Sequence, residues 1–453
     1  MVVIFALVSA VLLALFGALH WYVWRRLIRD TTPKGSRLRR AGSVAFVAGP
    51  LLSVGAMTAE GESVPFLVQR ILAWPGYLWM ALFLYLLLAL LAGEAVRPVL
   101  RRWLARRDVG AGLRQRVPAA TRPAEAQAGN GGTEELVSAD VPLPTPGHRG
   151  DSAAAGGTGG SVIVLAPTPA PATDTAPAGP SRRLFVSRVV GGAAAAVAVG
   201  TVGHGTYGVL RGPKVKHVTI PLAKLPRGAH GFRIAVVSDI HVGPILGRAF
   251  SQRVVDTINA TQPDLIAVVG DLVDGSVENL TPAVEPLARL RARHGTYFVT
   301  GNHEYISGAE PWIEKVRELG LRPLENARTE LPGFDLAGVN DVQGEAEGQG
   351  PDFDRALGDR DRSRAAVLLA HQPVVIRDAV RHGVDLQLSG HTHGGQLWPG
   401  SLLAELANPT VTGLERYGDT QLYVSRGAGA WGPPIRVGAP SDITVVELAS
   451  RQA

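Results

Sequence analysis

The sequence predicts an α/β domain preceded by an all-α transmembrane region. Long apolar runs occupy much of residues 1–107, and arginines cluster after the first and the third of them. From about Lys216 onward, short apolar stretches alternate with helical stretches, which is the pattern of an α/β sheet. A segment of small and polar residues separates these two parts. We therefore expect a membrane region and a folded domain that are joined by a linker.

Three apolar runs predict about three transmembrane helices within residues 1–107. These runs are Val2–Trp24, Ala41–Met57 and Ile71–Gly93. The first and third match the ~20 residues that a helix needs to cross the hydrocarbon core of a bilayer, whereas the second is shorter and contains Pro50. Buried helices of a soluble protein are the alternative, but runs this long and this uniformly apolar are unusual there.

The charge distribution predicts how these helices are oriented. Residues 1–215 carry 22 Lys and Arg against 11 Asp and Glu, whereas residues 216–453 carry 23 against 28. The basic residues cluster beside the apolar runs, which favours membrane topology over binding to nucleic acid. By the positive-inside rule, the loop after the first run and the segment after the third lie in the cytoplasm, with the N-terminus outside.

Residues 108–180 form a low-complexity segment. They are mainly Ala, Gly, Pro, Ser and Thr, with scattered charge. Such a composition cannot bury enough apolar surface to offset the entropy of ordering, so we expect a disordered linker.

Residues 181–212 resemble a twin-arginine signal, because Arg182 and Arg183 precede a long apolar run of small residues. A fourth transmembrane helix here would place everything downstream on the outer face. If this segment does not cross, the downstream part stays in the cytoplasm, and the basic residues Arg211 and Lys214 favour that alternative.

The C-terminal part, residues 213–453, contains five apolar stretches that predict strands. Each one ends in Asp, Asn or His, and five of the chain's 12 histidines lie at these ends. Ligand sites in open α/β sheets form at the carboxyl ends of strands, so we expect these side chains to share one site. The five stretches are Arg233–His241, Pro263–Gly275, Gly295–Tyr305, Ala365–Pro373 and Val384–Gly395.

Two histidines lie one residue apart in the last of these stretches. In an extended segment successive side chains alternate between faces, so His391 and His393 would point the same way. Gly394 and Gly395, which follow directly, would keep the backbone clear where a ligand approaches.

The residue types at the strand ends predict a metal site. Asp, Asn and His bind borderline-to-hard divalent ions such as Mn, Fe or Zn. The absence of cysteine excludes thiolate metal sites, disulfides and a cysteine nucleophile. The candidate ligands exceed what a single tetrahedral ion needs, so we expect two ions that share a carboxylate. Asp271, which follows Gly270 at a strand end, is the candidate for the shared ligand.

Five short motifs occur here in a fixed order: DIH, GDLVDG, GNHE, AHQP and GHTHGGQ. In this order they resemble the motif set of the calcineurin-like metallophosphoesterase superfamily. The ending YVSRGAGAWGPPIRVGAPSDITVVEL is most similar to a membrane-associated bacterial branch of that superfamily. The resemblance covers about Arg233–Leu448, roughly half the chain. It implies that the α/β domain is a two-sheet sandwich flanked by helices.

The resemblance also implies the ligands of two divalent metal ions. His303 would bind neither ion; as the catalytic residue it would stabilise or protonate the phosphate during transfer. Asp274 and Glu304 would orient these groups, although an ordinary solvated carboxylate is an equally good interpretation of each. The implied ligands are Asp239, His241, Asp271 and His393 for one ion, and Asp271, Asn302, His371 and His391 for the other.

We therefore expect a multi-pass protein of the cell membrane whose two-metal phosphoesterase domain lies on the outer face. It would hydrolyse phosphomonoesters or phosphodiesters, with lipid-linked or cell-envelope compounds among the candidate substrates and membrane lipid as a partner. No nucleic-acid partner is expected, and the sequence carries no signal for an oligomeric state. The alternatives are a metal-binding sensor without activity and the regulatory domain of a membrane transporter. Spans almost free of charged residues count against the transporter.

Three further residues have two interpretations each. Trp398 and Trp431 would line an apolar substrate cleft or pack at its rim, and packing is the more common use of tryptophan. Arg426 would reach a substrate phosphate or hold a turn.

Overall fold

The computed structural model describes residues 2–59, 64–115 and 182–452. The described residues up to Leu100 and from Arg183 onward form one compact unit, which does not include residues 101–115. The predicted linker over residues 116–180 lies outside the described residues.

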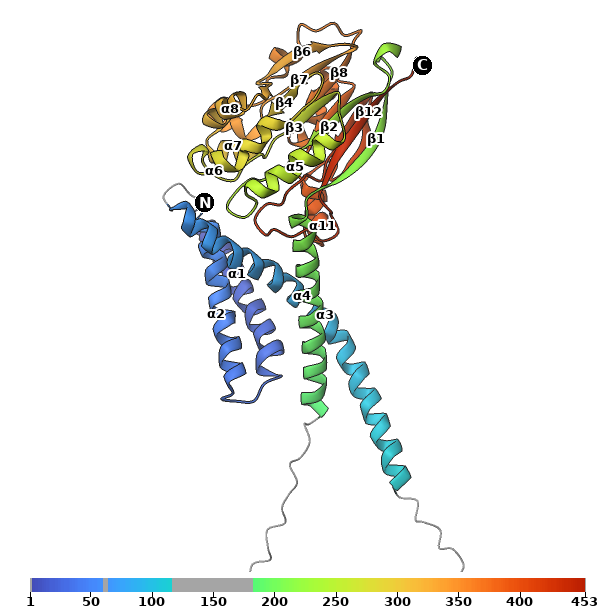
Figure 1. Cartoon of the computed structure of the whole chain (residues 1–453). Coiled ribbons are helices and arrows are strands. Elements are labelled where there is room, and N and C mark those ends of the chain that lie inside the picture. The colour runs from blue at the N-terminus through green and yellow to red at the C-terminus, as the bar shows by residue number, and fades with distance from the viewer. Residues whose placement is uncertain (1, 60–63, 116–181, 453) are drawn as a thin grey trace, which may run out of the picture. The chain divides into compact units, whose positions relative to one another are not determined.

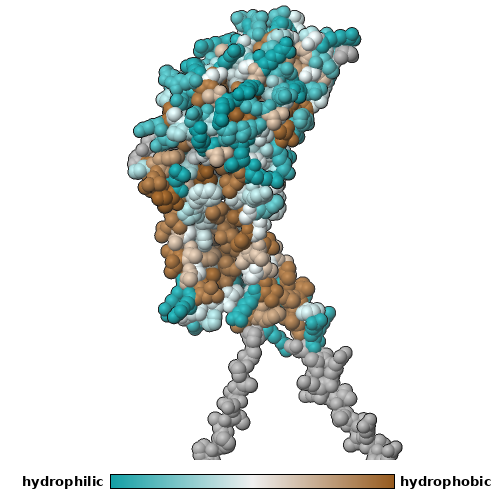
Figure 2. Space-filling view, viewed as in Figure 1, coloured by the Kyte–Doolittle hydropathy of each residue, from teal (hydrophilic) through white to brown (hydrophobic). Residues whose placement is uncertain are grey.

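Four long helices carry the apolar runs: α1 (Val2–Trp24), α2 (Arg37–Thr58), α3 (Phe66–Gln115) and α4 (Arg182–Leu210). All four are long and apolar enough to cross a membrane. Hydrophobic side chains cover much of their surface (Figure 2), as a lipid environment requires. A short π-helical turn, η1 (Arg25–Arg29), follows α1. Helix α3 continues to Gln115, so residues 108–115, expected to begin the linker, are helical.

The C-terminal part contains two six-stranded mixed sheets flanked by helices (Figure 1), which confirms the predicted fold class. The first sheet has the order β1-β12-β2-β3-β4-β5, and the second has the order β10-β11-β9-β8-β7-β6. The strands of the first sheet are β1 (Lys214–Leu222), β2 (Phe232–Val237), β3 (Leu265–Val269), β4 (Thr296–Val299), β5 (Arg322–Pro323) and β12 (Asp442–Ser450). Those of the second are β6 (Ala327–Leu331), β7 (Phe334–Gly338), β8 (Ala365–Leu369), β9 (Leu386–Ser389), β10 (Gly413–Tyr417) and β11 (Thr420–Val424).

The C-terminal part also contains short helices, most of which pack on the outer faces of the two sheets. They are α5 (Arg248–Ala260), α6 (Val277–Val284), α7 (Asn302–Ser307), α8 (Ala309–Glu318), α9 (Phe353–Leu357), α10 (Ile376–Arg381) and α11 (Gly400–Ala407). Short 3₁₀ helices occur in the connecting segments: η2 (Arg227–Ala229), η3 (Glu285–Arg289), η4 (Val342–Glu347), η5 (Pro373–Val375) and η6 (His393–Gly395).

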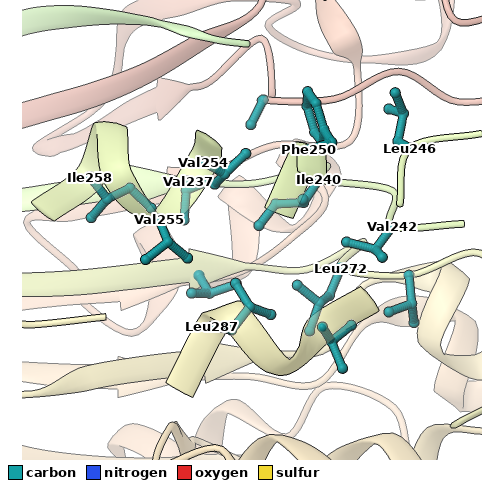
Figure 3. Packing of buried hydrophobic residues seen from close by; sticks show 14 of the residues in the cluster. Val237, Ile240, Val242, Leu246, Phe250, Val254, Val255, Ile258, Leu272 and Leu287 are labelled. Carbon is teal, nitrogen blue, oxygen red and sulfur yellow. The ribbon is translucent and has the colours of Figure 1, made fainter. Parts of the chain in front are cut away.

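The central strands are apolar on both faces because both faces are buried. Strand β2 sends Ala235 and Val237 to the layer under α5 and sends Ile234 and Val236 to the layer between the sheets. In the helix layer, Val254 and Ile258 of α5 lie near Val237 (Figure 3). A third cluster packs α9 and α10 against the second sheet. The domain is therefore a helix, sheet, sheet, helix sandwich.

Parallel pairing sets the direction of the strand ends. Strands β2, β3 and β4 are parallel neighbours in the first sheet, and β7, β8 and β9 are parallel neighbours in the second. Parallel neighbours present their carboxyl ends at one edge of a sheet, so the residues that follow these strands can meet.

Candidate metal centre

The predicted ligands follow the strands at nearly constant offsets. Asp239 and Asp271 are each the second residue after β2 and β3, and His371 and His391 are each the second residue after β8 and β9. Asn302 is the first residue of α7, three residues after β4. The two sheets thus supply ligands from the same edge, and the side chains are brought together between them.

Five of these residues have a left-handed backbone. Their φ angles are 52° for Asp239, 49° for His241, 52° for Asp271, 72° for His391 and 52° for His393. Residues other than glycine rarely adopt this conformation, and such strain is concentrated at functional sites, where packing holds it in place. The strands stop, and the chain turns each side chain inward.

The extended conformation expected for His391–His393 is therefore wrong. Strand β9 ends at Ser389, and η6 begins at His393. The two histidines reach one site because the backbone turns, and not because side chains alternate along a strand. Gly394 and Gly395 have φ angles of 61° and 81°, and a Cβ on either would meet neighbouring protein atoms. Their role is to form and pack this turn, not to clear a path for a ligand.

The first group of ligand atoms contains Asp239, His241 and His393, all buried. The Nε2 atoms of His241 and His393 lie 3.0 Å apart, and the His393 Nε2 lies 3.4 Å from Oδ1 of Asp239. Ligand atoms on a tetrahedral ion with bonds of about 2.0–2.1 Å are separated by a little over 3 Å. The three atoms therefore converge as ligands of one cation do.

The second group contains Asp271, His371 and His391. Nε2 of His371 lies 3.0 Å from Oδ2 of Asp271, and Nδ1 of His391 lies 3.0 Å from Oδ1 of Asn302. Nδ1 of His371 lies 2.8 Å from the carbonyl oxygen of Val269. A carbonyl only accepts, so Nδ1 donates to it and Nε2 is left for a metal.

Asp271 lies between the two groups. Its Oδ2 is 3.0 Å from His371 Nε2 and 3.9 Å from His241 Nε2, while its Oδ1 accepts the backbone N–H of His303 at 2.9 Å. The position is the one that a shared ligand would need. The structure thus brings together all eight side chains named from the sequence, although the extended backbone expected for two of them is incorrect.

The electrostatics of the site fit a pair of cations. Burial and the charge of Asp271 raise the pKa of Asp239, because two buried carboxylates repel. Burial also opposes ionisation of Asp271, but the imidazole of His371 outweighs it and lowers the pKa of Asp271. Burial disfavours the charged form of His371, yet Asp271 raises its pKa well above the ordinary value. The ionised carboxylate of Asp271 therefore stabilises a positive charge next to it.

His391 and His393 are held uncharged, the form in which imidazole binds metals. Burial lowers the pKa of His391 to about 4, and burial together with Arg436 holds the pKa of His393 well below its ordinary value. Nε2 of His371 is buried and has no hydrogen-bond partner of good geometry among the described residues. This donor set fits two divalent cations.

His303 lies beside these groups and outside both. Its Nδ1 is 2.8 Å from Oδ1 of Asp274, and its ring lies edge-on to that of His241 at 4.8 Å. Burial lowers its pKa, but the hydrogen bond and charge of Asp274 outweigh this and raise the pKa of His303 to about 9. His303 therefore carries a proton at neutral pH.

Asp274 and Glu304 both orient the site. Oδ1 of Asp274 also lies 2.8 Å from Nδ1 of His241, so it holds two imidazoles at once. Glu304 is fully buried and accepts three backbone N–H groups, from Asp271 at 3.0 Å, Leu272 at 2.8 Å and Gly301 at 2.7 Å. Neither is a solvated surface carboxylate, and Glu304 fixes the loop that carries Asp271.

Gly301 lies closest to the candidate shared ligand. A Cβ on Gly301 would be 2.3 Å from Oδ1 of Asp271, a distance that no side chain can occupy. This glycine therefore makes room for the carboxylate of Asp271.

Arg436, a buried arginine in the loop before β12, was not predicted from the sequence as part of the site. Its guanidinium donates to the carbonyl oxygens of Gly429, His393 and Arg426, and one Nη lies 2.9 Å from Nδ1 of His393. Burial lowers its pKa to about 10. The sequence did contain one indication of a buried arginine, because Arg436 is the one charged residue in the otherwise apolar stretch GPPIRVGAP. Arg426, named instead, contributes its backbone carbonyl to Arg436.

Comparisons with known proteins agree with this geometry. The sequence profile of the calcineurin-like phosphoesterase family matches residues 232–395. An uncharacterized metallophosphoesterase of Helicobacter pylori strain J99 is 42% identical over 248 residues, which are 54% of this chain and 66% of that protein. A transmembrane protein with a metallophosphoesterase domain from Danio rerio is 39% identical over 259 residues, 54% of this chain and 59% of that protein.

A third relative is matched over nearly its whole length. It is an uncharacterized metallophosphoesterase of Aquifex aeolicus, 34% identical over 243 residues, which are 52% of this chain and 92% of that protein. The first two relatives are longer than the matched region, and the chain spans about 60–66% of their length. On the matched domain and the ordered motifs within it, the chain belongs to the calcineurin-like metallophosphoesterase family.

Proposed function

We propose that the protein is a membrane-anchored phosphoesterase that uses two divalent metal ions to hydrolyse phosphomonoesters or phosphodiesters. The observation that carries this proposal is the pair of converging ligand groups with Asp271 between them. Membership of the family supports it. The four apolar helices support attachment to a membrane.

Each ion would be held by four side chains. Asp239, His241 and His393 would hold one ion and His371, His391 and Asn302 the other, with Asp271 shared. Two bound cations supply charge neutralisation of the phosphoryl group and acidification of the attacking water. The ions would be Mn, Fe or Zn, all of which suit Asp, Asn and His.

His303 would act as the general acid. It carries a proton at neutral pH because of Asp274, and it lies next to the ligand groups without belonging to either. A leaving alkoxide needs a proton, and the imidazolium of His303 would donate it. General acids of this kind typically contribute about a hundredfold or more in rate.

The catalytic domain would lie on the outer face of the membrane. Helix α4 begins with Arg182 and Arg183, and the domain starts with β1 only a few residues after its other end, Leu210. Basic residues mark cytoplasmic helix ends, so the end that carries the domain would be outside. A C-terminal alkaline phosphatase fusion would then be active. An inactive fusion that is expressed and inserted in the membrane would overturn this topology.

Lipid-linked or cell-envelope phosphoesters are the proposed substrate class. A domain held at a membrane surface meets compounds of that surface at high local concentration. Apolar side chains beside His303, such as Trp431 at 5.7 Å between ring centres, suit a leaving group with an apolar part.

Asp271→Asn tests the proposed chemistry. The substitution keeps the size of the side chain but removes the charge that both ions would share, so hydrolysis of an aryl phosphate ester should fall by several orders of magnitude. Metal content, measured by inductively coupled plasma mass spectrometry on the purified full chain, should fall with it. Circular dichroism should show an unchanged fold.

Asp256→Asn on the exposed face of α5 is the matched control, because it makes the same chemical change away from the site. It should keep both activity and metal content. If the unsubstituted chain binds manganese but hydrolyses neither mono- nor diesters, the protein is a metal-binding sensor and the proposed activity is wrong.

A further inference from the structure

A cavity of about 310 Å³ opens beside His303. One end is lined by His241, Asp274 and His303, which places the proposed general acid in its wall. The volume is near the lower end of the range for small-molecule sites, about 300–1,000 Å³. The cavity therefore suits a small group next to the reacting phosphate.

Transmembrane helices form another wall of the same cavity. Ala56 lies near the end of α2, and Ala73 and Tyr77 lie in the first turns of α3. These three are buried and form one apolar cluster, against which Ile245 of the domain packs. The cavity thus extends from the proposed acid to helices that are apolar enough to cross a bilayer.

Helix α3 has two different faces at this level. Ala73 and Tyr77 are four residues apart and share the face that lines the cavity. Leu67 and Ile71 are 67% and 62% exposed, as residues that face lipid would be. One helix therefore separates the cavity from the hydrocarbon of the bilayer.

The domain side of the cavity combines apolar residues with the polar side chains of Ser276, Asn279 and Ser307. Ile306 of α7 and Trp431 line it and are 70% and 53% exposed. The Trp431 ring lies 5.7 Å from that of His303. Of the two tryptophans considered for an apolar cleft, Trp431 lines this cavity, while Trp398 is bound elsewhere, with its carbonyl accepting from the Tyr85 hydroxyl at 3.1 Å.

We infer that this cavity binds the leaving group of the substrate, and that this leaving group is an alcohol with a hydrocarbon chain. The inference rests on the proposed function. It specifies which part of the substrate is apolar and which residues contact that part. A general acid must reach the leaving oxygen, so the group that departs lies on the side of His303. The cavity on that side has a mainly apolar lining and continues to α2 and α3. A volume this small holds only the first part of a chain, and the rest lies along the helices.

The reaction is a hydrolysis. The bond between phosphorus and the alcohol oxygen breaks, and a bond between phosphorus and the oxygen of water forms. The attacking water keeps one of its protons and releases the other to solvent. The proton on His303 goes to the departing alcohol oxygen, and solvent then returns a proton to His303. The products are the long-chain alcohol and phosphate, or a phosphomonoester if the substrate is a diester.

The test compares ethyl, hexyl and octyl esters of phosphate, and the same three esters of methyl phosphate, on the full chain in lipid nanodiscs with added manganese. All esters are kept below their critical micelle concentrations, and the released alcohol is measured. Burial of each methylene contributes about fourfold to kcat/KM when the chain enters an apolar site. We expect the ratio of octyl to ethyl kcat/KM to be at least about tenfold.

Two substitutions from opposite walls should reduce that ratio. Ala73→Trp places a large side chain in the cavity from the wall formed by α3. Ile306→Asp places a charge on the wall formed by α7. Ile306 is exposed, so its substitution tests the inference even if Ala73→Trp disturbs helix packing. Partition of the esters into the nanodisc is the same for all variants, so a fall of about fivefold in the ratio reports the site itself. Val380→Asp on α10, away from this cavity, should leave the ratio unchanged.

The outcomes separate the inference from the proposed function. If the unsubstituted chain hydrolyses none of the esters, the proposed function fails. If it hydrolyses them without dependence on chain length, or if both substitutions leave the ratio unchanged, the activity stands and the leaving-group site is overturned.

Discussion

At the scale of single residues, Asp274 connects two functions of the site. One carboxylate oxygen contacts Nδ1 of His241, whose other nitrogen points into the first ligand group, and Nδ1 of His303, the proposed acid. A change at Asp274 therefore affects both metal binding and proton transfer. The geometry allows these two effects to be measured separately.

Asp274→Asn should move the alkaline limit of activity to lower pH. His303 must be protonated to act as an acid, and Asp274 raises its pKa to about 9, so activity should persist to about pH 9 and fall above it. Without the charge of Asp274, one of the main causes that raise the pKa of His303 is lost, so this pKa falls. The pH dependence of kcat/KM for an aryl phosphate would show the shift.

Metal content at each pH is the control for Asp274→Asn, because His241 also loses its partner. An unchanged alkaline limit with full metal content would mean that His303 does not supply the proton.

Single residues also mark the limit of what the sequence could predict. The ligands could be named because they follow apolar stretches in a recognisable order. Their left-handed backbone could not be predicted, because the φ angle at Asp239 or His391 depends on the loops packed around each residue. Arg436 was missed for a similar reason, since its partners are backbone carbonyl groups, including that of His393 in another loop, and the sequence does not show that they converge.

At the scale of elements, the carboxyl ends of β2, β3, β8 and β9 position the ligands, and the start of α7 completes the arrangement. Gly301 precedes this helix and Asn302 begins it. The carboxylate of Glu304 binds the backbone at Gly301 and at the loop after β3. The loop that carries Asp271 and the helix that carries Asn302 therefore move as one piece.

Gly301→Ala should disturb this contact. The new Cβ would lie 2.3 Å from Oδ1 of Asp271, so the carboxylate must shift and both proposed ions lose a ligand. We expect a loss of activity of about a hundredfold or more, with a matching loss of bound metal and near-native circular dichroism. The measurement is kcat/KM with metal content on the same sample.

Gly228→Ala is the matched control, because a Cβ there meets no atom within 4 Å. If Gly301→Ala keeps full activity, the shared role of Asp271 is wrong.

The elements themselves were largely predictable. Strands of five or so consecutive apolar residues, such as β3 and β8, are recognisable because both of their faces are buried. The length of α3 could not be predicted, since the composition of its C-terminal turns resembles that of the low-complexity segment that follows. The cavity wall formed by α2 and α3 was also beyond prediction, because it depends on which faces of the helices meet the domain.

At the scale of the whole molecule, the two buried carboxylates of Asp239 and Asp271 couple stability to metal. They lie in the interior of the domain, and burial together with the charge of Asp271 raises the pKa of Asp239. A ligand that binds only the folded state stabilises it in proportion to the logarithm of its concentration over Kd. Metal at about a hundred times Kd would add roughly 3 kcal/mol.

Chelation should therefore lower the melting temperature of the full chain, and manganese should restore it. Differential scanning fluorimetry in detergent, with and without EDTA, checks this. The Asp271→Asn variant should respond much less, because it lacks the shared ligand. Equal melting temperatures with and without chelator in the unsubstituted chain would contradict a structural contribution of the metals.

The connection between α4 and the domain limits where the proposed enzyme can work. Only Arg211, Gly212 and Pro213 separate α4 from β1, and even fully extended they span about 11 Å. Two backbone hydrogen bonds also restrain this connection. The N–H of Gly212 donates to the carbonyl oxygen of Val209, and that of Lys214 donates to the carbonyl oxygen of Ser441. With α4 in a bilayer, the catalytic centre has a fixed height above the surface and cannot swing out to reach a distant substrate. Encounters then depend on lateral diffusion within the membrane, so turnover should follow the surface density of substrate in the bilayer instead of its bulk concentration.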